Sequence, residues 1–267
     1  MSSSSDRQGG FALLSVLWGL AFLGVLAAAI AAVATDRAHR ARNLAEAARA
    51  EALADAGFVH GVAHLLEHAG DPLWRADGQP YALDLGDGRV EIVLRDEAGR
   101  VDVNYADQAL LAGLLAGAGL DAEAAEALAD AIQDWSDGDD LRRLNGAEAA
   151  DYRDAGIDPP ANRPFALVAE LARVKGMRPD LLRRLEPHLT IHSRQRGLDP
   201  TVASAELLAL LPGVTPERVE GLVRPAGIQA TALGQFIGLD PRHVVASKRQ
   251  VFSIRAAART SGGGTFV

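Results

Sequence analysis

The chain has 267 residues, no cysteine and a formal net charge of −8 at pH 7. The lack of cysteine excludes a disulfide framework, a cysteine nucleophile and a thiolate zinc site. The acidic balance argues against a nucleic-acid surface and is compatible with a cation site. Gly-x-Ser-x-Gly, GxxxxGK[ST] and HExxH signatures are absent from the sequence, so the common hydrolase, nucleotide and zincin motifs give no lead.

An uncharged, mostly apolar segment begins at Phe11, directly behind a polar leader of residues 1–10 that ends in a Gly-Gly pair. No charged side chain occurs in residues 11–35, and a helix of that length spans about 37 Å, enough to cross a bilayer. A secretory h-region is only about 7–15 residues long, so the segment predicts a transmembrane helix. The open alternative is a discarded signal peptide, because several Ala-x-Ala cleavage sites lie within residues 27–35.

The residues after the apolar segment continue the helix. Residues 36–70 are rich in Ala, Leu, Glu and Arg, and their apolar positions recur near helical spacing. The pattern predicts one helix of about 60 residues that ends at Gly70. Residues 81–105 then alternate apolar and polar side chains around two glycine-containing turns, which predicts two or three short antiparallel strands.

From residue 106 to 239 the pattern becomes helical, in short pieces. The helices are predicted in two pairs, at residues 110–120 with 122–135 and at residues 164–177 with 179–189. A weak repeat relates residues 109–115 to 206–223, each of which predicts a helix, a tight glycine turn and a second helix. Residues 247–260 return to alternation. A strand so far from the others indicates that the helical region is inserted into a helix-plus-sheet domain.

A dense group of acidic residues follows the first helix pair. Four aspartates lie within seven residues around Gly138, and Glu148 and Asp151 follow on a predicted short helix. The aspartates are Asp134, Asp137, Asp139 and Asp140. Carboxylates around a glycine bend suit Ca²⁺, a hard cation that takes about six to eight oxygen ligands, although the spacing is not that of a complete EF-hand. Composition alone leaves a metal site and a solvated acidic loop equally open.

Three histidines, His60, His64 and His68, are spaced along one face of the long helix. Imidazoles one turn apart can share a zinc ion, and residues 64–68 match the H-x-x-E-H pattern of inverted zinc proteases. Such short matches often arise by chance, so we favour a polar flank of the helix as their interpretation.

Together these parts resemble the K-type minor pseudopilins of the type II secretion system. The resemblance covers nearly the whole length: a leader ending in Gly10, Phe11 opening the membrane helix, an α/β body and a large helical insert. The leader and Phe11 are shared by type IV pilin-like proteins in general. Two segments narrow the match to the K type, DWSDGDDLRRLNGAEAADY at residues 134–152 and NRPFALVAELARVKGM at residues 162–177.

The resemblance implies an α+β fold in which a long N-terminal transmembrane helix and a pilin-like antiparallel sheet are interrupted by a large inserted all-α domain with helix-hairpin-helix or SAM-like units. The expected division is a prepilin leader at 1–10, the N-terminal helix at 11–70 with 11–35 in the membrane, a pilin-like body at 71–105 and 245–267, and the inserted helical domain at 106–244. Family members generally continue beyond the position of Val267, so the resemblance also implies a further strand after this chain's last residue.

Processing of the leader is a further implication of the resemblance. A prepilin peptidase of the inner membrane is expected to cut between Gly10 and Phe11 on the cytoplasmic side and to methylate the amino group of Phe11. Glycine suits the cut because it has no Cβ to clash in a narrow active site. Most pseudopilins carry Glu at the fifth mature position, where this chain has Ser15. An unpaired carboxylate in lipid is costly, so its absence, shared by K-type members, fits a tip subunit with no neighbour above it.

The expected function is that of a minor pseudopilin without enzymatic activity, which initiates or caps pseudopilus assembly for protein export across the outer membrane. Its expected partners are the I- and J-type minor pseudopilins, the exported cargo, the secretion machinery and the prepilin peptidase, with no nucleic acid. One helix is expected to anchor it in the inner membrane, with the body in the periplasm. The small residues at 27–34 favour close helix contact in the membrane.

Calcium is the cofactor that the resemblance implies, because family members bind it in the inserted domain. The ligands expected on that basis are Asp137, Asp139 and Glu148. Asp134, Asp140 and Asp151 are expected as further ligands or as groups that support the ligands.

Two other classes of function stay open at this stage. A membrane-anchored, competence-type DNA-binding protein would use the helix-hairpin-helix units to hold DNA. Residues 196–224, however, contain three arginines against four acidic residues, and phosphate binding needs cations. A membrane-bound hydrolase would rest only on the HLLEH match and on scattered acids, which do not by themselves make a catalytic pair.

Overall fold

The computed structural model describes residues 9–67, 74–220 and 227–267, together with residues 222 and 224. The chain divides into two compact units. The first consists of the described chain up to Gly57 with Leu83–Val90 and Ala257–Val267, and the second consists of Phe58–Ala82 and Glu91–Ala256.

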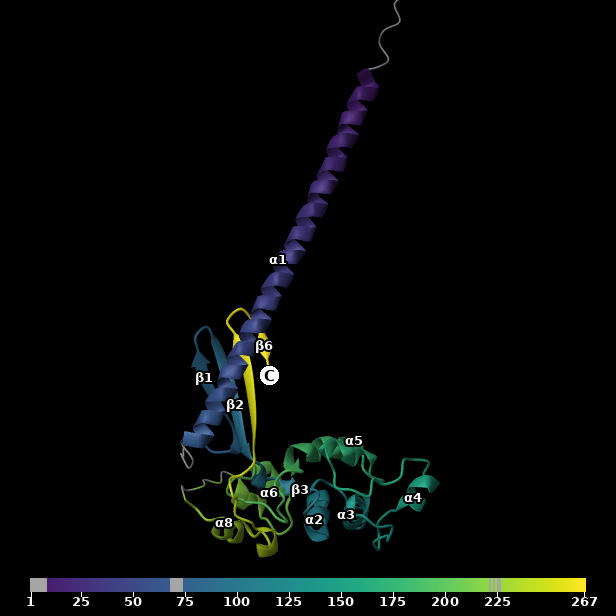
Figure 1. Ribbon diagram of the computed structural model, residues 1–267, viewed down its shortest axis with the longest axis vertical. Helices are drawn as coiled ribbons and strands as arrows, with labels where there is room; N and C mark the ends of the chain where they lie inside the picture. Colours follow the sequence, from purple (N-terminus) through teal and green to yellow (C-terminus); the bar gives the residue numbers. More distant parts are fainter. Residues whose placement is uncertain (1–8, 68–73, 221, 223, 225–226) are drawn as a thin grey trace, which may run out of the picture. The chain divides into compact units, whose positions relative to one another are not determined.

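Helix α1 (Gly9–Glu67) is unbroken, as Figure 1 shows, and confirms the predicted long helix. No proline interrupts residues 11–67, so every turn can keep its backbone hydrogen bonds. Within the described ranges, α1 is the one helix that is long and apolar enough to cross a membrane. The predicted end at Gly70 and leader residues 1–8 lie outside the described residues.

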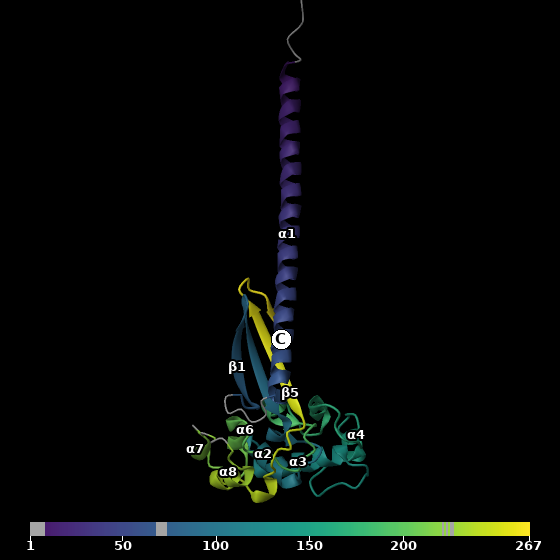
Figure 2. The same ribbon diagram turned by 60° about the vertical axis from the view of Figure 1, so that its left-hand side comes forward.

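A four-stranded sheet contains β1 (Asp77–Leu85), β2 (Gly88–Asp96), β5 (Phe252–Thr260) and β6 (Thr265–Phe266), in the spatial order β1-β2-β5-β6. Figure 2 shows β1 and β5 in this sheet. The turn between β1 and β2 contains Gly86 with a φ of +60°, a left-handed conformation that glycine adopts without strain. Strand β5 lies beside β2 although the whole helical region separates them, which confirms the predicted return of the chain to the sheet.

Helix α1 packs closely on the sheet. In the second unit, a Cβ added at Gly61 would lie 3.2–3.3 Å from side chains of Ile92, Leu94 and Ile254. The missing side chain thus lets the helix backbone approach the apolar face of β2 and β5. In the first unit, the Thr260 hydroxyl donates a hydrogen bond of 2.7 Å to the Glu46 carboxylate, which ties α1 to the end of β5.

Of the two or three antiparallel strands predicted within residues 81–105, two are present as β1 and β2, and the remaining strand of this segment joins a different sheet. Strand β3 (Val101–Asp102) pairs in parallel with β4 (Leu189–Thr190) and forms a separate two-stranded sheet. Between β2 and β3, the 3-10 helix η1 (Glu97–Gly99) diverts the chain, and the Asp96 side chain caps it by accepting from the Ala98 N–H. Alternation along a strand does not reveal a pairing partner so distant in sequence.

The helical region is built from short elements. These are α2 (Gln108–Gly117), α3 (Ala122–Ser136), α4 (Ala149–Asp154), η2 (Val168–Arg173), α5 (Pro179–Leu185), η3 (Glu186–His188), α6 (Ala205–Leu210), α7 (Pro216–Val219), α8 (Ala230–Ile237) and η4 (Pro241–His243). Asp107, Asp121 and Ser204 cap the N-termini of α2, α3 and α6 by accepting a backbone hydrogen bond. Gly119 follows α2 and Gly213 follows α6, each with a left-handed backbone. Both predicted units, in which a glycine turn joins two helices, are therefore confirmed.

The predicted helix over residues 164–177 is present only as the short 3-10 helix η2. The Glu170 side chain accepts a hydrogen bond of 3.2 Å from the Ala166 N–H and pairs with Arg163 at 3.2 Å. The Glu170 side chain therefore satisfies the Ala166 N–H in the segment that precedes η2. Gly176, with a φ of +92°, then redirects the chain toward α5.

Two glycines of α2 allow the chain after α6 to approach its backbone. A Cβ at Gly117 would lie 2.0 Å from the Leu210 carbonyl oxygen, and one at Gly113 would lie 2.4 Å from the Pro212 ring. A backbone carbonyl and a proline ring have no flexible end that can move aside. Leu110 and Leu114 lie on the same face of α2 as these glycines, at helical spacing, and are buried in the core of the second unit.

We expect Gly117→Ala to lower the free energy of unfolding by about 1–3 kcal/mol, because the added methyl group overlaps the Leu210 carbonyl. Ala116→Ser on the exposed side of the same helix is the matched control and should change little. Denaturant unfolding of the detergent-solubilised chain measures both. Equal stability of the two variants would contradict the close approach of α2 to residues 210–212.

Candidate metal centre

The acidic segment forms the loop between α3 and α4, and aromatic side chains hold both of its ends. Trp135, at the end of α3, and Tyr152, within α4, are both buried, with ring centroids 5.6 Å apart. Phe165 stacks on Trp135 at 6.4 Å, and the Tyr152 hydroxyl accepts a hydrogen bond of 2.9 Å from the Lys175 N–H. Residues 134–152, one of the two segments on which the family resemblance rests, thus combine an acidic loop with two side chains of a buried aromatic cluster.

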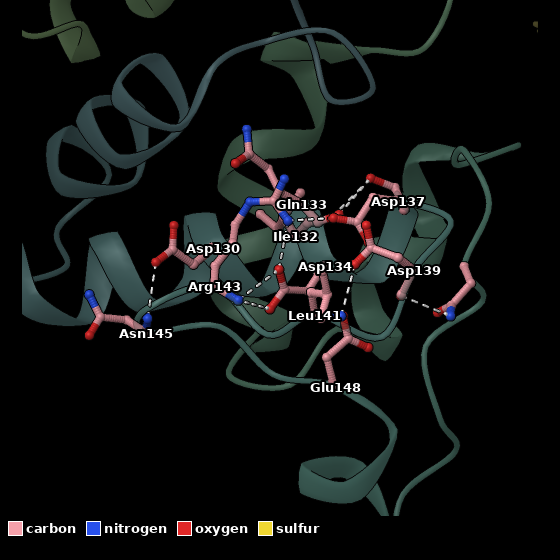
Figure 3. A network of polar contacts seen from close by, with 12 residues as sticks. Asp130, Ile132, Gln133, Asp134, Asp137, Asp139, Leu141, Arg143, Asn145 and Glu148 are labelled. Atoms are coloured by element: carbon pink, nitrogen blue, oxygen red, sulfur yellow. Dashed lines mark hydrogen bonds and ion pairs between the residues drawn. The ribbon is translucent and has the colours of Figure 1, made fainter.

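Three of the predicted ligands come together. One carboxylate oxygen from each of Asp137, Asp139 and Glu148 lies within 4.8 Å of the others. Asp137 is half-buried, Asp139 is exposed and Glu148 is buried, so the group lies at the surface with a closed inner side. Asp137 ends α3 and Glu148 precedes α4, which means that two helix termini and the loop between them position all three (Figure 3).

Glu148 is the most perturbed group of this site. Its side chain is 5% exposed, and neither of its carboxylate oxygens has a hydrogen-bond partner among the described residues. Burial, followed by repulsion from Asp134, Asp137, Asp140 and Asp139, raises the pKa of Glu148 from 4.5 to about 7. Asp137 Oδ1 is likewise buried without a hydrogen-bond partner in the described structure. A buried carboxylate without donors is destabilising unless a cation or a proton neutralises it.

Asp134 does not join the three converging oxygens but supports them through Arg143. The fully buried Asp134 carboxylate accepts hydrogen bonds from the Arg143 backbone N–H at 3.2 Å and from its guanidinium at 2.7 Å. The same guanidinium also pairs with Asp137, as the dashed lines of Figure 3 show. A Cβ at Gly146 would lie 1.9 Å from Asp134 Oδ2, so glycine is required where the loop crosses this carboxylate.

The other two predicted residues have different partners. Asp140 accepts a hydrogen bond of 3.2 Å from the Asn162 side chain, which also donates to the Asp139 carbonyl at 3.2 Å. Asp151 accepts from the Glu148 N–H at 3.0 Å and from the Arg142 guanidinium at 3.2 Å. The hydrogen bond from Glu148 lowers the pKa of Asp151. Both residues therefore brace the loop.

Sequence reasoning missed Arg143 and Gly146. Arg143 lies in the acidic segment, where the resemblance directed attention to the carboxylates, and its partners depend on how the loop turns back onto α3. The Asn-Gly pair at residues 145–146 was a readable turn signal, but it did not indicate the buried carboxylate beneath it.

The donor set fits a hard divalent cation. All three converging groups are carboxylates, and oxygen ligands are those that Ca²⁺ takes. The unpartnered oxygens of Glu148 supply acceptors that no protein donor uses. Arg143 pairs with Asp134 and Asp137, but Asp139 and Glu148 have no ion pair within the described residues, so negative charge remains in excess.

The histidine pattern of α1 has a structural interpretation. The rings of His60 and His64 pack against Trp74, with centroids 5.3 and 4.6 Å away, and Trp74 stacks on Tyr81 at 4.6 Å. His68 lies outside the described residues. The packing of both imidazoles against aromatic rings agrees with the interpretation as a flank of the helix.

The part of the chain that contains the acidic loop matches a known protein family. Residues 91–194 match the family model described as "Type II secretion system (T2SS), protein K". The type II secretion system protein K of Pseudomonas aeruginosa is 27% identical over 175 residues, which cover 61% of this chain and 51% of that protein. The putative type II secretion system protein K of Escherichia coli is 28% identical over 209 residues, covering 70% of this chain and 63% of that protein. The chain thus spans about half to under two thirds of these relatives.

The fold has a solved counterpart. It matches a chain in the crystal structure of the GspK–GspI–GspJ complex from the enterotoxigenic Escherichia coli type 2 secretion system, with a TM-score of 0.59 and 18% identity. The match covers 84% of this chain and 88% of that chain. The long apolar helix and the antiparallel sheet form a pilin-like fold. The family match over residues 91–194 and the similarity to two proteins named type II secretion system protein K agree with the resemblance to K-type minor pseudopilins drawn from the sequence.

We expect the stability of the metal-free chain to fall as the pH rises from 4.5 to about 7, because folded Glu148 retains a proton that the unfolded chain has lost. Glu148→Gln should remove this slope and stabilise the metal-free protein at about pH 8 by about 1–3 kcal/mol. Urea unfolding in chelator at about pH 5 and pH 8 measures the effect. The exposed Glu126→Gln on α3 is the control and should keep the pH dependence of the natural chain. If the two variants show the same pH dependence of stability, the assignment to Glu148 is contradicted.

Proposed function

We propose that the chain is an assembly protein, a minor pseudopilin at the tip of the type II secretion pseudopilus that initiates or caps assembly for export across the outer membrane. The observation that carries this proposal is the combination of a pilin-like helix and sheet with an inserted region that matches protein K over residues 91–194. A bulky insert between β2 and β5 suits a terminal subunit. No catalytic role is part of the proposal.

The partners follow from the solved relative. That structure contains a K-type chain together with GspI and GspJ, so we propose that this chain joins the corresponding I- and J-type minor pseudopilins, and that exported cargo contacts the tip. Ser15 supports a terminal position, because a membrane helix with no neighbour above it has no cationic partner for a carboxylate at that depth. The exposed apolar face of α1 leaves surface for partner helices.

The location and processing are part of the same proposal. The apolar half of α1 anchors the chain in the inner membrane with the body in the periplasm, after the prepilin peptidase has cut between Gly10 and Phe11. Gly10 and Phe11 both lie within the described part of α1.

Calcium is proposed as the resident cation of the acidic loop. Asp137, Asp139 and Glu148 would hold it, and Asp134, Asp140 and Asp151 would keep the loop in position through Arg143, Asn162 and Arg142. The unpartnered Glu148 oxygens support this assignment. A bound divalent cation would neutralise the repulsion that raises the pKa of Glu148 and would stabilise the loop between α3 and α4.

The assembly role is tested by complementation of a strain that lacks this gene. The natural chain should restore export and should be recovered from membranes with a mature N-terminus at methylated Phe11. Gly10→Val should retain the leader and fail to restore export, because a branched side chain obstructs the peptidase. Gly19→Ala in the same helix is the control, since its Cβ would meet no described atom within 4 Å.

Intact mass and export assays separate the outcomes of this complementation. A mature chain that starts near Thr35 would show that the apolar segment was a signal peptide and would overturn the anchor. Correct processing with no effect on export would overturn the assembly role.

Calcium should raise the melting temperature of the metal-stripped chain. By mass action, the free energy of unfolding rises by about 2.7 kcal/mol at a calcium concentration of about 100 times the Kd. Asp139→Asn and Glu148→Gln should abolish the shift, whereas the exposed Asp154→Asn should keep it. Thermal unfolding with and without chelator measures the effect. An equal shift in all variants would place the calcium elsewhere.

A further inference from the structure

We propose that a cationic cavity in the second unit binds an acidic segment of a partner protein. The cavity has a volume of about 470 Å³ and is lined by two loops, residues 191–195 after β4 and residues 247–251 before β5, together with Asp96 and Ala98. It shares no residue with the acidic loop. The inference therefore depends on neither calcium nor the position of the chain in the pseudopilus.

The cavity gathers cations that have no acidic partner. Arg194, Lys248 and Arg249 all line it and are exposed, and none forms an ion pair within the described residues. The Arg249 guanidinium lies over the Phe252 ring, 5.9 Å from its centroid. Several other arginines of this unit do form ion pairs, among them Arg143, Arg163, Arg173, Arg224 and Arg242. In a chain with a net charge of −8, three such cations around one cavity form a local region of positive charge.

Two of these cations are held in a strained backbone conformation. Arg194 and Arg249 both have a φ of +53°, and the described residues include just one other non-glycine residue with positive φ, Asn162. This region disfavours residues with a long side chain, and glycine or asparagine would occupy it at lower cost. Strain of this kind concentrates at functional sites. Its coincidence at two arginines from different loops of one cavity indicates that the guanidinium groups are needed there.

Buried acids fix the two loops in place. The Asp102 carboxylate accepts hydrogen bonds from the Arg194 N–H at 2.8 Å and from the Ser193 hydroxyl at 3.3 Å. In the other loop, the Ser247 hydroxyl accepts from the Arg249 N–H at 2.8 Å and donates to the Asp96 carboxylate. The cations therefore line a cavity with a braced backbone, so little conformational entropy is lost when a ligand binds.

The chemistry of the lining selects the ligand. Asp96 is the one acidic residue of the lining, and its two oxygens accept hydrogen bonds from the Ala98 N–H and the Ser247 hydroxyl. Ile191 and Val251 add apolar surface, and Val251 is 40% exposed. Cations beside apolar surface, in a volume much larger than one carboxylate, fit a peptide that carries both acidic and apolar side chains. The acidic chain as a whole would repel a polyanion such as nucleic acid.

The test uses the full chain in detergent and a fluorescein-labelled peptide of alternating aspartate and leucine, with an alternating asparagine and leucine peptide as the uncharged control. Fluorescence anisotropy should show binding of the aspartate peptide alone, and the binding should weaken with salt. Arg194→Gln and Lys248→Gln should each weaken it about tenfold. Arg183→Gln, an exposed arginine of α5 with no described partner, is the matched control and should leave binding unchanged.

A second variant separates the binding role from a structural one. Arg194→Gly relieves the left-handed strain while it keeps the N–H that Asp102 accepts, so the melting temperature should rise as peptide affinity falls. A melting temperature that falls instead would assign Arg194 to the fold and overturn the proposal.

Two competition arms test the class of ligand. If inorganic phosphate displaces the labelled peptide as effectively as unlabelled peptide does, the cavity is a general anion site. If a single-stranded oligonucleotide binds more tightly than the aspartate peptide, the cavity is a nucleic-acid site. Either result overturns the proposal, as does equal binding of the two labelled peptides.

Discussion

The pairing of β2 with β5 is the constraint on which the rest of the structure depends. These strands flank the helical region, so their pairing closes a long loop and brings the two ends of the insert together. Loop closure costs entropy that grows slowly with length, and burial of the apolar strand faces against α1 offsets it. The pairing continues past the sheet, where the Glu97 N–H donates to the Val251 carbonyl and Ser247 donates to Asp96. A helical domain can therefore be carried on a pilin-like scaffold without breaking the sheet.

Within the second unit, the loop between α3 and α4 shows how a fold can hold unfavourable charge. Trp135 and Tyr152 anchor the ends of the loop in an aromatic cluster, and Arg143 neutralises part of the acidic group. Glu148 is left buried, without a donor and beside other carboxylates, and its raised pKa records the cost. The apolar packing of the loop ends supplies the stability that permits this arrangement, and the remaining negative charge defines what the loop can bind.

Buried aspartates have a different role at the cationic cavity. Asp96 and Asp102 lie beneath its two loops, where burial raises the pKa of each, while backbone and serine donors satisfy their oxygens. These carboxylates are used for backbone geometry, which leaves the cations above them without acidic partners. The same unit thus contains one loop in which carboxylates outnumber the cations and one cavity in which cations outnumber the carboxylates.

The sequence by itself determined the features that depend on neighbouring residues. The length of α1 follows from an uninterrupted helical pattern, and Asp137, Asp139 and Glu148 converge because a short loop joins two helix ends. The tertiary structure alone decided the contacts between distant segments. The parallel partner of β3, the position of Arg143 and the cavity formed by residues 191–195 and 247–251 all depend on how the closed insert folds back on itself. Local periodicity reports which face of a segment is buried, but it does not report which distant segment covers that face.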